Sequence, residues 1–131
     1  MSTQWDSYVA EFLKVPGVTS AALLDKNPAA LSVWASSKDF STDTACLHAV
    51  VKDFGTDGAL ALNGITLKPG FKYMTTSATP EFVHGKKNAE GVMLFATKTG
   101  IIVVTYGSDA VPGTVSAGIS KYADYLIGMN V

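Results

Sequence analysis

The chain has 131 residues, with ten Lys, no Arg and eleven acidic residues for a net charge of −1, and this length predicts a single domain over residues 1–131. Apolar residues make up 47% of the chain and charged residues only 16%, a balance that excludes an intrinsically disordered protein. Because there is no net positive field to hold a phosphate backbone, we expect no nucleic-acid partner.

The start of the chain and its single cysteine indicate the compartment. Trp5, Asp6 and Glu11 stand where a signal peptide would have a basic start and an apolar run. No apolar run approaches the roughly 20 residues that cross a bilayer. Cys46 has no second thiol to pair with, so we expect it to be a small buried hydrophobe. Together these features predict a cytosolic protein.

The spacing of apolar residues divides the chain into three helices and a series of short strands. Helical spacing bounded by Pro or Gly predicts helices over residues 5–13, from 41 or 42 to 54, and 112–127. Short apolar or alternating runs predict strands over residues 18–24, 31–34, 59–62, 65–67, 71–75, 81–84, 92–97 and 101–106. The first two strands are expected to form a hairpin, and the last four suit an antiparallel meander.

The two terminal helices are expected to lie together. A helix at each end of the chain and a sheet between them bury one another most economically if both helices cover one sheet face. At about 100° per residue, Tyr125 falls off the apolar stripe of the last helix and Tyr122 lies at its border. Tyr8 lies at the border of the first helix's stripe, and Trp5 stands in its first turn. We therefore expect aromatic rings on one wet surface between these helices.

Rings with polar tips in a row suit an extended proline-rich segment, whose left-handed helix is ordered before it binds. The same residues could instead pack in or beside the core, or bind a small molecule, and the residues alone leave these alternatives open. The aromatics concerned are Trp5, Tyr8, Trp34, Tyr122 and Tyr125.

Five pieces of the sequence occur in an order and at spacings typical of one family. They are Trp5-Asp6-Ser7-Tyr8-Val9; Val33-Trp34-Ala35; Gly85-Lys86-Lys87 with Gly91-Val92, Lys98-Thr99 and Val103 to Tyr106; Pro112-Gly113-Thr114; and Ala123-Asp124-Tyr125-Leu126-Ile127. On these pieces the chain resembles the profilin family over essentially its whole length, and it is most similar to amoebal and plant members. Ala10 departs from the family pattern, which usually has an acidic or amide residue there.

The resemblance implies an α+β fold, in which a central antiparallel sheet of about six to seven strands has the N- and C-terminal helices on one face and another helix on the opposite face. It implies an actin-monomer-binding regulator of the cytoplasm and cytoskeleton that controls actin nucleotide exchange and filament assembly. Neither an enzyme nor a cofactor-binding protein is implied. The implied partners are monomeric actin, proline-rich proteins such as formin-type nucleators, and acidic phosphoinositides bound weakly.

Carried over by matching position, the resemblance implies three sets of site residues. The proline-binding face would be Trp5, Tyr8, Trp34, Tyr122, Tyr125 and Leu126. The actin-binding face would be Lys72, Lys86, Lys87, Val92, Pro112, Gly113, Thr114 and Lys121. Lys86 and Lys87 would also meet phosphoinositides through a modest, salt-sensitive attraction. Without the resemblance, this lysine pair alone would indicate a solvated hairpin loop.

Other chemistry finds little support in the sequence. His48 and His84 lack metal-ligand partners at the usual spacing, and Cys46 is too close to His48 for one helical face. Lys98-Thr99-Gly100 matches only a fragment of a hydrolase motif. We therefore expect no metal site and no catalytic residue. The alternative from another class is an adaptor domain on a similar scaffold that binds phosphoinositide or vesicle partners without actin.

Overall fold

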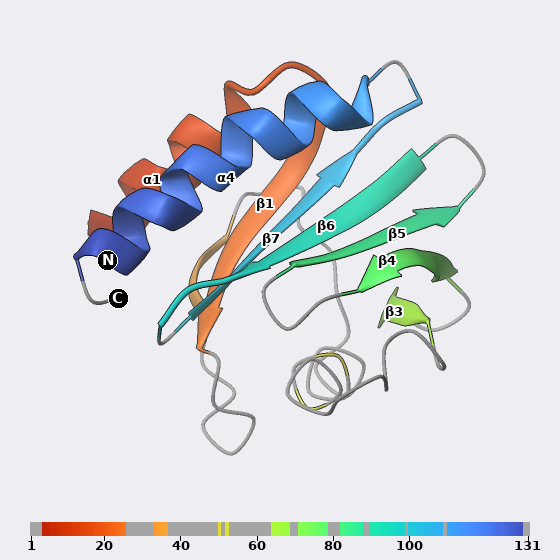
Figure 1. The fold of residues 1–131 in the computed structure, drawn as a ribbon, viewed down its shortest axis with the longest axis horizontal. Helices are drawn as coiled ribbons and strands as arrows, with labels where there is room; N and C mark the ends of the chain where they lie inside the picture. Colours follow the sequence, from red (N-terminus) through yellow and green to blue (C-terminus); the bar gives the residue numbers. More distant parts are fainter. Residues whose placement is uncertain are drawn as a thin grey trace.

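The computed structural model describes residues 4–25, 33–36, 50, 52, 64–68, 71–78, 82–87, 90–98, 100–108 and 110–129. Within these ranges, a curved antiparallel sheet of seven strands lies against two helices (Figure 1). The elements in chain order are α1 (Gln4–Leu13), β1 (Val18–Asp25), β2 (Val33–Ser36), β3 (Ile65–Lys68), β4 (Phe71–Ala78), β5 (Phe82–Lys87), β6 (Glu90–Ala96), β7 (Gly100–Tyr106) and α4 (Pro112–Gly128). The expected α+β class is confirmed.

The sheet has the strand order β2-β1-β7-β6-β5-β4-β3, and every neighbouring pair is antiparallel. Strands β4 to β7 follow one another as the expected meander, and β3 extends it by pairing with β4. The pairing of the first two strands is also confirmed, with Leu23 of β1 opposite Ala35 of β2. Because β1 pairs with β7 as well, the start of the chain is held beside the strand that leads into α4.

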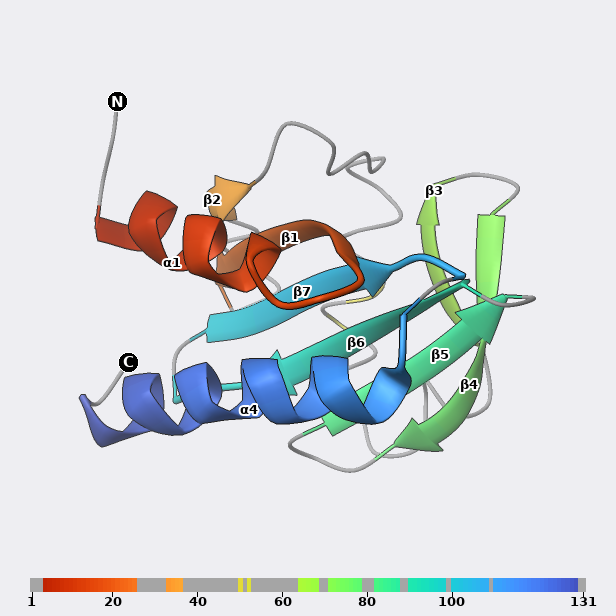
Figure 2. The same ribbon diagram turned by 90° about the horizontal axis from the view of Figure 1, so that it is seen from above.

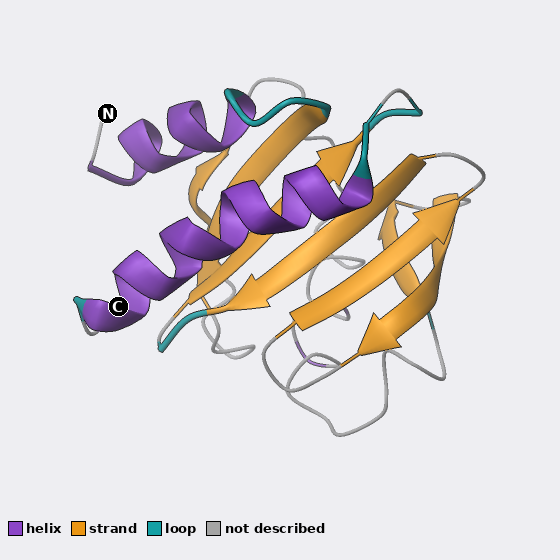
Figure 3. Cartoon of the chain, turned by 45° about the horizontal axis from the view of Figure 1, so that its top comes forward, coloured by secondary structure: helices purple, strands orange, loops and turns teal. Residues whose placement is uncertain are grey.

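Both helices bury their apolar stripes against the same face of the sheet (Figures 2 and 3). On α4 the stripe consists of Val115, Ile119, Ala123 and Leu126, at the three- and four-residue spacing of one helical side. These residues share a cluster with Phe12 of α1 and with side chains of β1, β6 and β7. The first turn of α1 and the last turn of α4 therefore lie at the same end of the molecule (Figures 1 and 2).

The opposite face of the sheet carries a second core cluster. Residues 92–95 of β6 alternate between the two clusters, because successive strand residues point to opposite sides. Val50 is buried in the second cluster. Of the helix expected from residue 41 or 42 to 54, only Val50 and Lys52 are described, so its place on this face stays a prediction. The strand expected over residues 59–62 lies outside the described ranges.

Strand β5 continues to Lys87, past its expected end at His84. Gly85 does not break the strand, because it is paired with Thr75 of β4 on one side and Val92 of β6 on the other, and there is no room for a side chain at this position. A Cβ built on Gly85 would lie 2.8 Å from Cδ1 of Ile65 and 3.0 Å from Cβ of Tyr73. The two lysines that follow therefore belong to a strand and not to a hairpin loop. In the described part of the chain, neither helix has the length and apolar character needed to cross a membrane.

Candidate binding surfaces

Two pairs of aromatic rings join α1 to α4. The rings of Tyr8 and Tyr125 have centroids 6.2 Å apart and planes inclined at 43°. Phe12 meets Tyr122 edge to face, at 5.4 Å and 71°. Tilted and edge-on arrangements of this kind are favoured by the quadrupoles of the rings. The two helices are thus linked by two separate pairs of rings, one made by Tyr8 with Tyr125 and the other by Phe12 with Tyr122.

Exposure distinguishes the outer rings from the inner one. Tyr125 is 57% exposed, Tyr8 and Tyr122 are half-buried, and Phe12 is fully buried. The predictions of an exposed Tyr125 and of border positions for Tyr8 and Tyr122 are therefore confirmed. Burial, followed by the charge and the hydroxyl hydrogen bond of Tyr125, raises the pKa of Tyr8, so the Tyr8 phenol is neutral near pH 7. We call Tyr8, Tyr122 and Tyr125 the aromatic face.

The other members of the expected proline-binding set have different positions. Leu126 is fully buried in the cluster beneath α4, so its expected ligand contact is corrected to a supporting role under the rings. It follows Tyr125 by one residue and so points about 100° away from it around the helix. Trp5 lies in the first turn of α1 and Trp34 in β2, which packs beside α1. Their side chains lie outside the described residues, and their roles stay predictions.

Lys121 lies beside the aromatic face. Its Nζ stands 5.5 Å from the ring centroid of Tyr122, within the range of a cation–π contact. The side chain is exposed. The resemblance implies an actin contact for Lys121, and that role stays a prediction.

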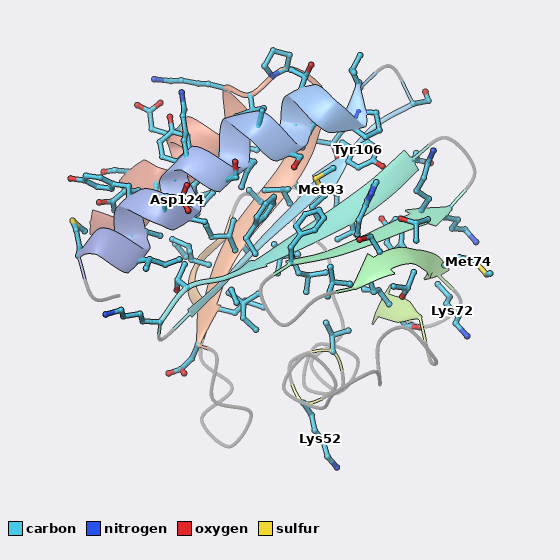
Figure 4. All side chains as sticks on the ribbon, viewed as in Figure 1. Lys52, Lys72, Met74, Met93, Tyr106 and Asp124 are labelled. Carbon is cyan, nitrogen blue, oxygen red and sulfur yellow. The ribbon has the colours of Figure 1, made fainter. Side chains whose placement is uncertain are left out.

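A second surface lies at the β3–β4 end of the sheet. Lys72 and Met74 alternate along β4, and Lys86 of β5 lies directly opposite Met74, so these three side chains project from one side of the sheet. Met74 is 70% exposed, Lys72 is exposed and Lys86 is half-buried. Lys87, the next residue of β5, points to the other side. Figure 4 shows Lys72 and Met74 far from Asp124 on α4. We call Lys72, Met74 and Lys86 the lysine surface.

The start of α4 lies toward the same end of the molecule as the lysine surface (Figures 1 and 2). Val111, just before the helix, is 63% exposed. Pro112 is half-buried in the first turn, and the next two residues are exposed. Val92 was expected to supply apolar surface for a partner, but it is fully buried in the second core cluster. That expectation is corrected, because β6 is covered on both of its faces.

The exposed apolar surface at this end comes instead from Met74 and Val111, which the sequence analysis did not single out. A signal for Met74 was present in its strand. Tyr73 is buried, and alternation along the strand points its neighbours Lys72 and Met74 to the other side of the sheet. A lysine on that side indicates that the side faces solvent. No comparable periodicity marks Val111, because it precedes the helix.

A hydrogen-bonded pair lies near the start of α4. Tyr106 of β7 reaches across β6 to His84 of β5, with Oη and Nε2 2.6 Å apart. Gly91 of β6 makes this possible, because a Cβ there would overlap the Tyr106 ring. Burial, followed by the charge of Lys86, lowers the pKa of His84. These contacts are consistent with the structural role expected for His84.

The described residues offer no metal or acid–base centre. No group of three or more His, Cys, Asp or Glu side chains among them could hold a metal ion. A depression of about 370 Å³ lies between the start of β1 and the β7–α4 connection, and Glu90 is the titratable side chain among its described lining residues. One carboxylate alone does not supply an acid and a base. Cys46 and His48 lie outside the described ranges.

Comparisons with known proteins give a consistent result. The profilin family model matches residues 3–131. Profilin-2 of Acanthamoeba castellanii is 34% identical over 125 residues, which cover 95% of this chain and 96% of that protein. A crystallised profilin of Schizosaccharomyces pombe has a TM-score of 0.88 at 29% identity, covering 98% of this chain and 100% of that one.

Two solved complexes share the fold at lower identity. One holds mouse profilin IIa with a double repeat from the FH1 domain of mDia1, at a TM-score of 0.76 and 19% identity, over 98% of this chain and 100% of that chain. The other holds LokiProfilin2 with rabbit actin, at a TM-score of 0.78 and 18% identity, over 98% of each chain. At these identities the likeness concerns the fold alone.

Proposed function

Because this chain belongs to the profilin family, whose members are cytoplasmic regulators of the actin cytoskeleton and not enzymes, we propose that it binds monomeric actin and proline-rich segments of other proteins. Through these two activities it controls nucleotide exchange on actin and the assembly of filaments. Mouse profilin IIa is known in complex with an FH1-domain repeat, and LokiProfilin2 is known in complex with actin. Both precedents support the proposal.

The observation that carries the proposal is the placement of two unlike surfaces at opposite ends of one sheet. The aromatic face lies between the terminal helices, and the lysine surface lies on β4 and β5. A ligand on one surface therefore leaves the other open. This arrangement suits a protein that holds an actin monomer while it is tethered to a second protein.

Proline-rich segments fit the chemistry of the aromatic face. Their left-handed helix has no internal hydrogen bonds, so its carbonyl oxygens are free to accept. Tyr8 and Tyr125 present rings on which prolines can stack. The neutral hydroxyl of Tyr8 and the exposed hydroxyl of Tyr125 can donate hydrogen bonds to the carbonyl oxygens. The proposal includes Trp5 of α1 and Trp34 of β2 as further residues that bind the proline-rich segment.

Actin, an acidic protein, fits the chemistry of the opposite end. Lys72 and Lys86 draw an acidic partner and orient it, and Lys87 adds positive charge on the other side of β5. This attraction weakens as salt is raised. Exposed Met74 and Val111 supply apolar area that excludes water once the partner has docked. Residues 112–114 at the start of α4 complete this actin-binding surface.

The same lysines give the phosphoinositide proposal its basis. Lys86 and Lys87 project from opposite sides of the end of β5, and a lysine that reaches an anionic membrane surface contributes about 1 kcal/mol, which gives weak attachment that depends on salt. Sedimentation with liposomes at low salt tests this: a preference for phosphoinositide-containing over neutral liposomes supports it. Equal sedimentation with both kinds of liposome removes lipid binding from the function.

A reciprocal pair of variants tests the two protein-binding surfaces. Tyr125→Ala removes the most exposed ring of the aromatic face, and Met74→Ala removes an exposed apolar side chain at the opposite end. Binding of a proline decamer is followed by intrinsic tryptophan fluorescence, since the chain has only two tryptophans and both are proposed to lie at that site. Binding of monomeric actin is measured separately by sedimentation velocity.

Each variant should lose one activity and keep the other. Tyr125→Ala should weaken decamer binding by about 1–3 kcal/mol and leave actin binding unchanged, and Met74→Ala should do the reverse. A folded wild-type protein that binds neither ligand contradicts the proposal. Anionic-liposome binding without actin binding would instead support the adaptor alternative.

A further inference from the structure

Lys121 is held where a ligand on the aromatic face would meet it. Its Nζ lies 5.5 Å from the ring centroid of Tyr122, whose ring is supported from the core side by Phe12. Residues four apart on a helix are surface neighbours, with Cβ atoms about 5–6 Å apart, so Lys121 also stands next to exposed Tyr125. One ammonium group therefore borders two of the three rings of the aromatic face.

The charge of Lys121 is not neutralised within the described part of the chain. The other lysine of the helical layer, Lys14, forms an ion pair with Glu11 at 3.1 Å. Lys121 has no carboxylate within 4 Å among the described side chains. Asp124 is the acidic residue of α4. It directly precedes Tyr125 and so points about 100° away from it, whereas Lys121 is separated from that ring by only about 40° around the helix.

We propose that Lys121 gives the aromatic face a charge preference, so that it selects proline-rich segments with Asp or Glu beside the prolines over segments with Lys or Arg there. The inference rests on the proposed function, because it takes the aromatic face as the proline-binding surface. A proline-rich helix advances about 3.1 Å per residue, so a side chain next to the stacked prolines comes within reach of the ammonium group. The contact lies at the rim of the site, and it sets preference among ligands more than total affinity.

Three decamer peptides test the preference, with the prolines flanked at both ends by Gly, Glu or Lys. Flanks at both ends make the result independent of the direction in which the peptide lies. An exposed ion pair of this kind changes a binding constant by about 1.4- to 5-fold. We therefore expect the Glu-flanked peptide to bind about two- to five-fold more tightly than the Gly-flanked peptide at low salt, and the Lys-flanked peptide to bind more weakly by a similar factor.

Matched variants assign the effect to one side chain. Lys121→Gln should bring the three affinities together, and Lys121→Arg should restore their order. Lys14→Gln makes the same change of charge on an exposed lysine that follows α1 and is already paired, so it should keep the wild-type order. Raising the salt concentration should reduce the differences in the wild type and leave Lys121→Gln almost unaffected.

The outcomes separate this inference from the proposed function. If the Gly-flanked peptide does not bind, the proposed proline site is wrong and the inference fails with it. If that peptide binds but the three affinities are equal, the proline site stands and the charge preference is refuted. A preference that survives Lys121→Gln, or one for the Lys-flanked peptide, also overturns the role of Lys121. If the Lys-flanked peptide is the preferred one, Asp124→Asn should abolish that preference.

Discussion

The substitution Gly91→Ala should destabilise the fold through one buried contact. The ring of Tyr106, which is 1% exposed, lies against Gly91 and carries its hydroxyl to Nε2 of His84, 2.6 Å away. An added methyl group overlaps this ring, and overpacking of a core position costs about 1–3 kcal/mol. Loss of the hydrogen bond adds about 0.5–1.5 kcal/mol. We expect a total loss of about 2–4 kcal/mol in the free energy of unfolding.

Urea denaturation followed by circular dichroism measures this loss. For a chain of this size it corresponds to a fall in Tm of roughly 6–16 °C. Gly128→Ala is the matched control, because a Cβ at Gly128 has nothing within 4 Å. Replacing Gly by Ala in a helix stabilises it by up to about 1 kcal/mol, so the control should be neutral or slightly more stable than the wild type.

A double-mutant cycle tests the reasoning itself. In a Tyr106→Leu background the ring is absent, so Gly91→Ala should cost less than about 1 kcal/mol and the two changes should couple strongly. Two results would refute the argument. One is a cost below about 0.5 kcal/mol in the wild type, and the other is the same cost in both backgrounds.

Three further predictions concern pH, the core and the actin-binding surface. The pKa of His84 is lowered from 6.5 by burial and then by Lys86, so the unfolded chain takes up the proton first as pH falls. Urea midpoints should therefore decrease below about pH 6.5, and His84→Gln should flatten that decrease; parallel curves would contradict it. Leu126→Ala should cost about 2–5 kcal/mol of stability while Tyr125→Ala costs under about 1 kcal/mol, and equal midpoints would disprove the assigned burial. Replacing Lys86 and Lys87 together by Glu should weaken actin binding and its salt dependence but not proline-decamer binding; equal loss of both activities in a folded variant would rule out separate surfaces.

Helical periodicity predicted the exposure of side chains on the terminal helices, because it gives the direction of each side chain around the helix axis. It was sufficient to place Tyr125 in solvent and Tyr8 and Tyr122 at the borders of their stripes, as observed. The order of helices and strands followed from the same local patterns and from the Gly and Pro residues between them. The resemblance of five sequence pieces added the family, which the comparisons confirm.

Local patterns could not predict whether an element distant in the sequence covers a side chain. Val92 was expected on a partner-binding surface, but β6 is apolar along nearly its whole length and is covered on both faces, so alternation gave no information about which side met solvent. Leu126 entered the proline-binding set through the resemblance alone; helical spacing places it on the apolar stripe of α4, which is buried. Gly85 was expected to end a strand, but pairing with β4 on one side and β6 on the other continues the strand through it.

The sequence by itself therefore determined the order of the described helices and strands, the class of fold and the exposed ring of the last helix. The tertiary structure decided which residues could meet a partner, because exposure depends on what packs above a side chain and not on its own strand or helix. It also brought Lys121 over the ring of Tyr122 and His84 to the hydroxyl of Tyr106 across an intervening strand. The pairing of His84 with Tyr106 depends on strand register, which arises only when distant segments of the chain pair.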